Sequence, residues 1–193
     1  MSKNPEKSGW SVRSIAICAL LTALSVILAR LLIPMPNETT RFSIEAVPIF
    51  IAGMLFGPLP GAFTGFAADF IGCLFTPYGY NPIFCVPPIL YGLLAGAVRR
   101  PVTERPALLR TALAFFPAAV LGSVLWQSMA LALVYGGEAK EAFFLIKLVS
   151  RGIQFALTAS VDTLIVWLLL RRGALSGVQR HIQTKGGRKH DDP

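Results

Sequence analysis

The stretch that decides the fold is RFSIEAVPIFIAGMLFGPLPG, residues 41–61. Its apolar part, 44–56, predicts a short helix, and the GPLPG that follows at 57–61 predicts a tight reversal. A second short apolar segment, 62–75, comes directly after it. Each segment holds only about 13 or 14 residues, whereas a helix needs about 20 to cross a bilayer. Short segments interrupted by Gly and Pro are tolerated at membrane depth where they face protein or a water-filled cavity.

The rest of the chain is equally apolar. Of its 193 residues 54% are hydrophobic and only 15% are charged, against about 25% charged in a typical soluble domain. The apolar segments cover residues 11–33, 44–56, 62–75, 84–98, 108–135 and 143–170. We therefore predict an all-α integral membrane protein: a six-transmembrane-helix bundle whose short, Gly- and Pro-interrupted middle helices surround an outward-opening ligand cavity. Residues 1–172 form this domain, and residues 173–193 form a basic cytoplasmic tail that we expect to be disordered.

The net charge of +8 admits two interpretations. A basic surface binds nucleic acid, but membrane proteins also concentrate Lys and Arg in their cytoplasmic segments. With six crossings, 13 of the 18 basic residues fall on one side: before the first segment, in the connection around 99–110, and after the last segment. The distribution favours the second interpretation. We therefore expect a multi-pass protein with both termini in the cytoplasm and with no nucleic-acid partner.

The other basic residues lie at the opposite ends of the predicted spans, and they are Arg30, Arg41, Lys140, Lys147 and Arg151. Ionisable side chains within a membrane are costly and therefore indicate function. Arg30 either snorkels to the headgroups or binds an anionic ligand. Arg151 lies deeper in its span, which favours a role in ligand binding. Arg41 and Glu45 are four residues apart, and pairing along a helix is one explanation of both. Asp162 lies further down the last segment and receives no role.

Polar residues within and between the apolar segments are further candidates. Asp69 either hydrogen-bonds the N–H groups of a ligand or pairs with an arginine. Trp126 and Gln127 suit a flat heterocycle, by stacking and by hydrogen bonding, although helix packing explains them equally well. Tyr80 and Asn81 lie in a loop rich in aromatic residues and proline, where they form a pocket wall or an interfacial belt.

No catalytic or nucleotide-binding pattern is present. The sequence has no GxxxxGK[ST] loop, no GxSxG and no HExxH, so we expect neither ATP hydrolysis nor another enzymatic activity. The three cysteines, Cys18, Cys73 and Cys85, lie in apolar segments and are interpreted as small buried side chains without a metal or a disulfide. We expect no cofactor. If the protein is a transporter, its energy comes from a partner, an ion gradient or both.

Several stretches resemble one known family. The run at 41–61, AADFIG at 67–72 and YGLLAG at 91–96 resemble the substrate-binding S components of energy-coupling factor (ECF) vitamin transporters. The runs LTALSVILARLL at 21–32 and WQSMALALVYG at 126–136, with the arginine of the last segment, are most similar to the folate-specific type. The resemblance extends over nearly the whole chain apart from its two ends.

This resemblance implies a six-helix bundle in the bacterial cell membrane that binds a vitamin at the outer face. It also implies partners, namely an ECF transmembrane coupling protein and two ATPase subunits that drive uptake. In the family the first helix meets the coupling protein through small residues. The corresponding residues here are Ala16, Ala19 and Ala23, and the last two also form a small-xxx-small pair, which lets another helix approach closely.

The resemblance also implies a folate pocket that involves Arg30, Trp126 and Arg151, with Asp69 and the loop 76–82 beside them. Folate suits these residues chemically, because its pterin is flat and donates N–H groups while its glutamate tail is anionic. Two alternatives stay open. One is an S component for another heterocyclic vitamin, such as riboflavin or a thiamine precursor, and the other is a membrane scaffold whose polar residues only hold the helices together.

Overall fold

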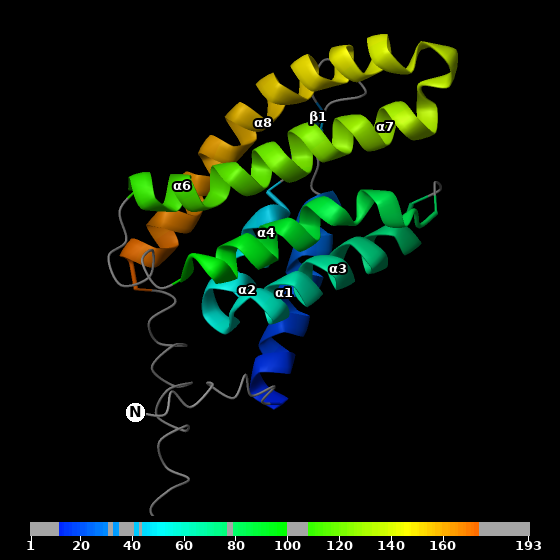
Figure 1. The fold of residues 1–193 in the computed structure, drawn as a ribbon. Coiled ribbons are helices and arrows are strands. Elements are labelled where there is room, and N and C mark those ends of the chain that lie inside the picture. Colours follow the sequence, from blue (N-terminus) through cyan, green and yellow to red (C-terminus); the bar gives the residue numbers. More distant parts are fainter. Residues whose placement is uncertain are drawn as a thin grey trace, which may run out of the picture.

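A computed structural model describes residues 12–30, 33–34, 41–42, 44–76, 79–99 and 108–173, with the two strands as backbone only. Within these residues six helical segments form one bundle (Figure 1), so the predicted six-helix architecture is confirmed. The basic tail beyond residue 173 lies outside the described residues, and its disorder stays a prediction.

The first four segments are mostly short. They are α1 (Val12–Arg30), α2 (Ala46–Phe56), α3 (Pro58–Leu74), and a 3₁₀ turn, η1 (Pro82–Phe84), that leads into α4 (Val86–Ala97). Two strands, β1 (Ile33–Pro34) and β2 (Arg41–Phe42), pair antiparallel between α1 and α2. The 11 residues of α2 and the 12 of α4 rise only about 16 to 18 Å, against about 30 Å of hydrocarbon. The middle helices are therefore short, as predicted.

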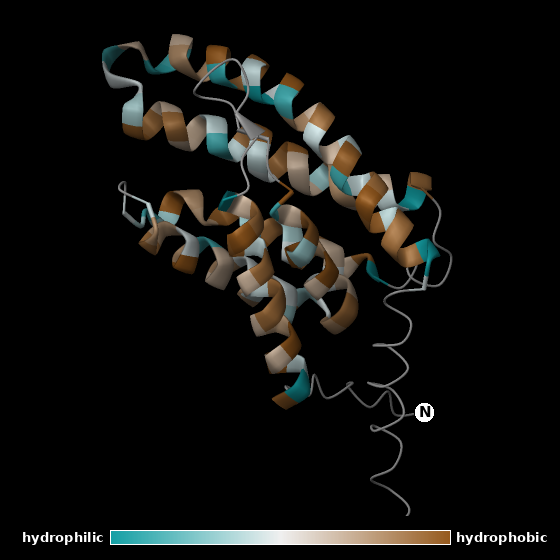
Figure 2. Ribbon diagram, turned by 180° about the vertical axis from the view of Figure 1, so that it is seen from behind, coloured by the Kyte–Doolittle hydropathy of each residue, from teal (hydrophilic) through white to brown (hydrophobic). Residues whose placement is uncertain are grey.

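The last two segments are long. The fifth consists of α6 (Leu108–Ala118), a π-helical stretch η2 (Ala119–Trp126) and α7 (Gln127–Tyr135), and the sixth of η3 (Gly137–Ala139) and α8 (Lys140–Arg171). In the described part of the chain three stretches are long and apolar enough to cross a membrane, and these are Val12–Arg30, Leu108–Tyr135 and Gly137–Arg171. Hydrophobic residues cover most of the helical surface, and hydrophilic ones lie at helix ends and at intervals along α8 (Figure 2).

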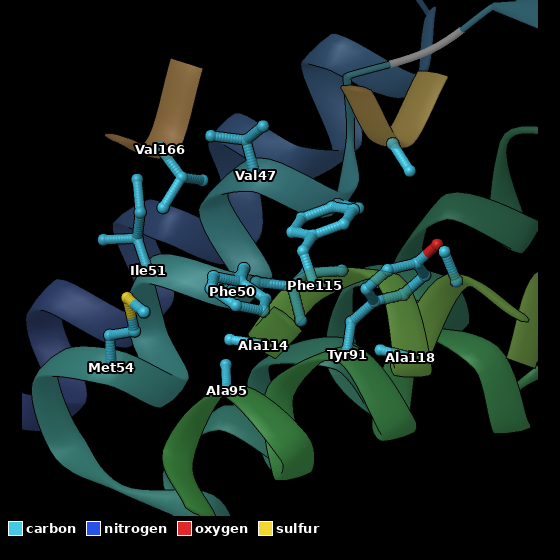
Figure 3. Packing of buried hydrophobic residues seen from close by; sticks show 14 of the residues in the cluster. Val47, Phe50, Ile51, Met54, Tyr91, Ala95, Ala114, Phe115, Ala118 and Val166 are labelled. Atoms are coloured by element: carbon cyan, nitrogen blue, oxygen red, sulfur yellow. The ribbon is translucent and has the colours of Figure 1, made fainter. Parts of the chain in front are cut away.

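The bundle packs around α2. Every residue of this helix from Ala46 to Leu55 is buried, because a helix that is hydrophobic on all sides is stable only inside other protein. On one side α2 meets α1, α3 and α4, and on the other the antiparallel pair of α6–α7 and α8 covers the bundle (Figure 1). At the centre the ring of Phe115 lies 4.8 Å from that of Phe50 and 5.2 Å from that of Tyr91 (Figure 3).

Glycines let α3 lie unusually close to α4. A Cβ atom placed on Gly61 would overlap the carbonyl oxygen of Gly92, and one placed on Gly92 would overlap the carbonyl oxygen of Gly61. Small residues allow such backbone contact between membrane helices. The turn between α2 and α3 depends on Gly57, whose φ of 104° is strained for any residue with a side chain.

The structure corrects several details of the prediction. The first span was expected over 11–33, but the helix ends at Arg30 and Ile33 belongs to the hairpin. The third span begins at Pro58 and not at 62, because proline is well tolerated in the first turn of a helix. Arg41 and Glu45 do not share a helix, since Arg41 lies in β2 and Glu45 precedes α2, so helical pairing does not explain them.

Candidate ligand-binding site

A cavity of about 590 Å³ lies at the end of the bundle where α1, α3 and α7 end and where α2, α4 and α8 begin. All six helical segments contribute residues to its lining. The volume is in the range of protein sites for small organic ligands.

Cationic side chains surround one part of the cavity. Arg30, Lys147 and Arg151 all line it. The guanidinium group of Arg30 donates to the backbone carbonyl of Gly72, and Nη1 of Arg151 donates to the carbonyl oxygen of Ser123 at 3.3 Å. An arginine carries five N–H donors, so neither contact uses up the capacity of its side chain. We call these three residues the cationic rim.

Aromatic rings hold the cationic rim in place. The guanidinium carbon of Arg30 lies 5.9 Å from the centroid of the Phe75 ring, and that of Arg151 lies 5.8 Å from the centroid of Phe155. The ammonium group of Lys147 is 5.4 Å from the centroid of the ring of Phe143. Each arrangement is within the range of cation–π attraction. The cations are thus oriented without being neutralised by these contacts.

Carboxylates line the same cavity. Glu45, Asp69 and Asp162 belong to the lining. Within the described structure the Oδ2 atom of Asp69 and the Oδ1 atom of Asp162 are buried without a hydrogen-bond partner. A buried acceptor left unsatisfied costs about 1 to 3 kcal/mol, and more when it is charged. Such atoms are expected where a ligand supplies the missing donor.

Hydroxyl groups line the cavity as well. The Tyr91 hydroxyl and the Ser123 Oγ are 3.1 Å apart and share a hydrogen bond. Ser25 Oγ donates to the backbone carbonyl of Glu45 at 2.7 Å, which fixes the start of α2 against α1. The cavity therefore offers cations, carboxylates and hydroxyls to one bound molecule.

The structure brings together four of the seven predicted ligand-binding residues. Arg30, Asp69, Gln127 and Arg151 line the cavity, although they come from α1, α3, α7 and α8. Whether they contact a ligand stays a prediction.

The other three residues are not part of the cavity lining. The indole N–H of Trp126 donates to the carbonyl oxygen of Ile83 at 2.8 Å, and Oδ1 of Asn81 accepts from the backbone N–H of Ile83 at 3.1 Å. The ring of Tyr80 packs edge-on against Phe70, with centroids 5.1 Å apart. Trp126 and Asn81 thus hold η1 in position, and their predicted contact with the ligand stays a prediction.

Sequence analysis missed a polar stripe along α8. Its members line the cavity, and they are Lys147, Arg151, Gln154, Thr158 and Asp162. They are three or four residues apart, so they share one face of the helix. This spacing is visible in the sequence, so the stripe could have been predicted from it. The prediction considered Arg151 and Asp162 separately and gave Asp162 no role.

The face of α1 that was predicted to meet a partner is open. Ala16, Ala19 and Ala23 are all exposed. Larger apolar residues on the same helix are exposed beside them, including Leu20 at 70% and Ile27 at 57%. The face is therefore available to lipid or to another membrane protein.

A membrane-embedded helical bundle with a polar cavity at one end is the architecture of a receptor for a small solute. Residues 9–171 match the family model described as ECF-type riboflavin transporter, S component. The chain therefore belongs to this family of S components. It is a substrate-binding subunit of an ECF-type transporter and a membrane protein, and it is not an enzyme.

Two relatives illustrate the match. The folate transporter FolT of Clostridium novyi (strain NT) is 25% identical over 146 residues, which cover 74% of this chain and 81% of FolT. The uncharacterized protein MG098 homolog of Mycoplasma pneumoniae (strain ATCC 29342 / M129 / Subtype 1) is 28% identical over 107 residues, which cover 50% of this chain. That stretch spans only 22% of the length of the Mycoplasma protein.

Solved structures show the same fold. A crystal structure of FolT bound with folic acid aligns with a TM-score of 0.70 at 25% identity, over 84% of this chain and 95% of FolT. A structure of ThiT from Listeria monocytogenes aligns with a TM-score of 0.62 at 17% identity, over 84% of this chain and 96% of ThiT.

Proposed function

We propose that this S component captures folate, or a related reduced folate, at the outer face of a bacterial cell membrane. The observation that carries the proposal is that the cationic rim and three carboxylates line one cavity. The relation to FolT, in sequence and in fold, supports the same ligand.

The two ends of folate suit the two kinds of charged side chain that line the cavity. Its glutamate tail carries two carboxylates, and Arg30 and Arg151 can bind a carboxylate through paired N–H donors. Its pterin ring carries an amino group and ring N–H groups, which suit unsatisfied carboxylate oxygens such as those of Asp69 and Asp162. Gln127 lines the cavity as well and can donate and accept at the edge of the ring.

Uptake requires partners. We propose that an ECF transmembrane coupling protein and two ATPase subunits supply the energy, and that the exposed face of α1 with Ala16, Ala19 and Ala23 meets the coupling protein. The proposed orientation places both termini in the cytoplasm. The cavity then opens outward, because α1, α3 and α7 end on the outer side.

Riboflavin is the second candidate, since the matching family model carries that name. Riboflavin has no carboxylate, so it would leave the cationic rim without a counter-ion. The pyrimidine and thiazole precursors of thiamine are uncharged and would also leave the rim without a counter-ion, and thiamine itself is a cation that the rim would repel. A pure scaffold does not need the buried unpartnered oxygens of Asp69 and Asp162.

The test is ligand identification on protein purified in mild detergent. We expect mass spectrometry of the extracted small molecules to find a folate, and titration of ligand-free protein to show tight binding of folic acid but not of riboflavin or thiamine. Tight binding of riboflavin, with none of folate, would replace the first candidate by the second. Binding of none of these vitamins would contradict the proposal.

A further inference from the structure

We propose that Asp162, at the far end of the polar stripe on α8, is the residue that recognises the amino-bearing edge of the ligand's ring system. The inference rests on the proposed function and adds to it a specificity-determining residue and a direction of binding. Folate would lie with its pterin toward Asp162 and with its glutamate tail at the cationic rim.

The first argument is the buried state of Asp162. The side chain is 1% exposed, yet it lines the cavity. Its Oδ1 atom has no hydrogen-bond partner within the described structure. A charged acceptor in this position is strongly destabilising unless a donor reaches it. The cavity is the direction from which that donor can come.

The second argument is that neighbouring groups do not satisfy Asp162. The hydroxyl of Thr158, one turn away on α8, donates to the backbone carbonyl of Gln154 at 3.0 Å. Tyr91 and Ser123 share a hydrogen bond with each other. Glu45 lines the same cavity and carries a carboxylate like that of Asp162. Carboxylates only accept hydrogen bonds when ionised, so this pair suits a ligand edge rich in N–H groups.

Asp162 and Asp69 differ in their distance from the cationic rim. Asp69 lies about one helical turn from Gly72, whose carbonyl accepts from Arg30, so this carboxylate stands close to the cationic rim. Asp162 follows Arg151 by 11 residues on one helix, a rise of about 16 Å. A molecule with carboxylates at one end and an amino-substituted ring at the other can therefore bind along α8 alone. Its carboxylates would meet Arg151 and its ring would meet Asp162.

The experiment compares ligands that differ at one end only. Folic acid is titrated beside pteroic acid, which lacks the glutamate, and beside an analogue of folic acid without the 2-amino group of the pterin. The variants are Asp162→Asn, which keeps the shape of the side chain and removes its charge, and Thr163→Val as a matched control. Thr163 is the next residue and also has a buried unpartnered oxygen, but it does not line the cavity.

We expect Asp162→Asn to lower the binding affinities for folic acid and for pteroic acid by the same factor, roughly 10- to 100-fold. The deamino analogue should bind the variant and the native protein alike, since it lacks the group that Asp162 recognises. Thr163→Val should change none of these affinities. Unchanged binding of folic acid by Asp162→Asn overturns the inference, and so does an equal loss for the deamino analogue, which would indicate a structural role.

Two further outcomes can be distinguished. If Asp162→Asn does not fold, the test uses the native protein alone. Equal affinities of the native protein for folic acid and for the deamino analogue overturn the inference, and an affinity for the analogue that is at least tenfold lower supports it. If the native protein binds no folate at all, the proposed function fails and the inference falls with it. Folate binding that is unchanged when Asp162 is replaced overturns the inference and leaves the proposed function intact.

Discussion

The side chain of Arg151 donates a hydrogen bond to the backbone carbonyl oxygen of Ser123, 3.3 Å away, and so joins α8 to the π-helical stretch η2. This stretch follows Pro117, which has no N–H to give to the preceding turn of α6. Wider π turns occur frequently at functional sites. The same contact places the Arg151 guanidinium beside the cavity, where its other donors can meet a ligand.

Replacing Arg151 tests the cationic rim. We expect Arg151→Ala to weaken folate binding roughly 10- to 100-fold, because a charged hydrogen bond in a shielded site is lost. Pteroic acid should lose less, since it lacks both carboxylates of the glutamate tail and keeps only its benzoate carboxylate. Isothermal titration in detergent measures both.

Arg171→Ala is the matched control for Arg151→Ala. Arg171 also lies on α8 and also sits over an aromatic ring, 5.2 Å from the centroid of Trp167, but it is exposed at the other end of the helix. Its replacement should leave folate binding unchanged. Equal effects of the two substitutions would contradict a specific role for Arg151.

Trp126→Phe separates stacking from structural support. The substitution keeps an aromatic ring and removes the donor to the Ile83 carbonyl. We expect a loss of stability of about 1 kcal/mol and little change in folate affinity, because Trp126 does not line the cavity. Thermal unfolding and ligand titration of the same preparation measure the two effects. A large loss of affinity at unchanged stability would point to direct contact between the indole and the ligand.

Gly61→Ala tests the close contact between α3 and α4. The new methyl group would overlap the carbonyl oxygen of Gly92, and forcing extra volume into packed structure costs about 1 to 3 kcal/mol. We therefore expect a lower melting temperature. Gly152→Ala in α8 is the control, because nothing lies within 4 Å of a Cβ atom there. Equal melting temperatures for the two variants would rule out the packing argument.

The partner face of α1 is tested by enlarging its small residues. We expect Ala19→Leu and Ala23→Leu to keep folate binding but to reduce co-purification with the coupling module and the uptake of folate by cells. Ala156→Leu on the exposed side of α8 should affect none of these. Normal uptake by both α1 variants would argue that the coupling protein meets another face.

Much of the fold was predictable because the local signals are strong. Gly57 and the prolines that follow it separate two short apolar segments, and the 15% of charged residues is well below the roughly 25% of a typical soluble domain. The hairpin of β1 and β2 was not predicted, since two residues per strand give no periodic pattern. The helix start at Pro58 was missed because proline was interpreted as part of a turn.

The candidate site was predictable only in part. Arg30, Asp69 and Arg151 stand out as charges among apolar residues, and all three line the cavity. Asp162 is just as conspicuous, but its importance depends on which face of α8 points inward, and that is set by packing against α2 and η2. Trp126 shows the opposite case. Its side chain is directed toward Ile83 by a π-helical stretch that could not be predicted from the sequence.

The unequal lengths of the helices have a consequence for the surrounding lipid. The 17 residues of α3 rise about 25 Å and expose Leu59, Phe63, Phe66, Phe70 and Leu74 outward, while the 32 residues of α8 rise about 48 Å. Lipids beside α3 must shorten to match it, whereas α8 must tilt or project beyond the headgroups. The protein thus imposes a thickness gradient on its annular lipids, and its energy in the membrane depends on acyl-chain length differently on its two sides.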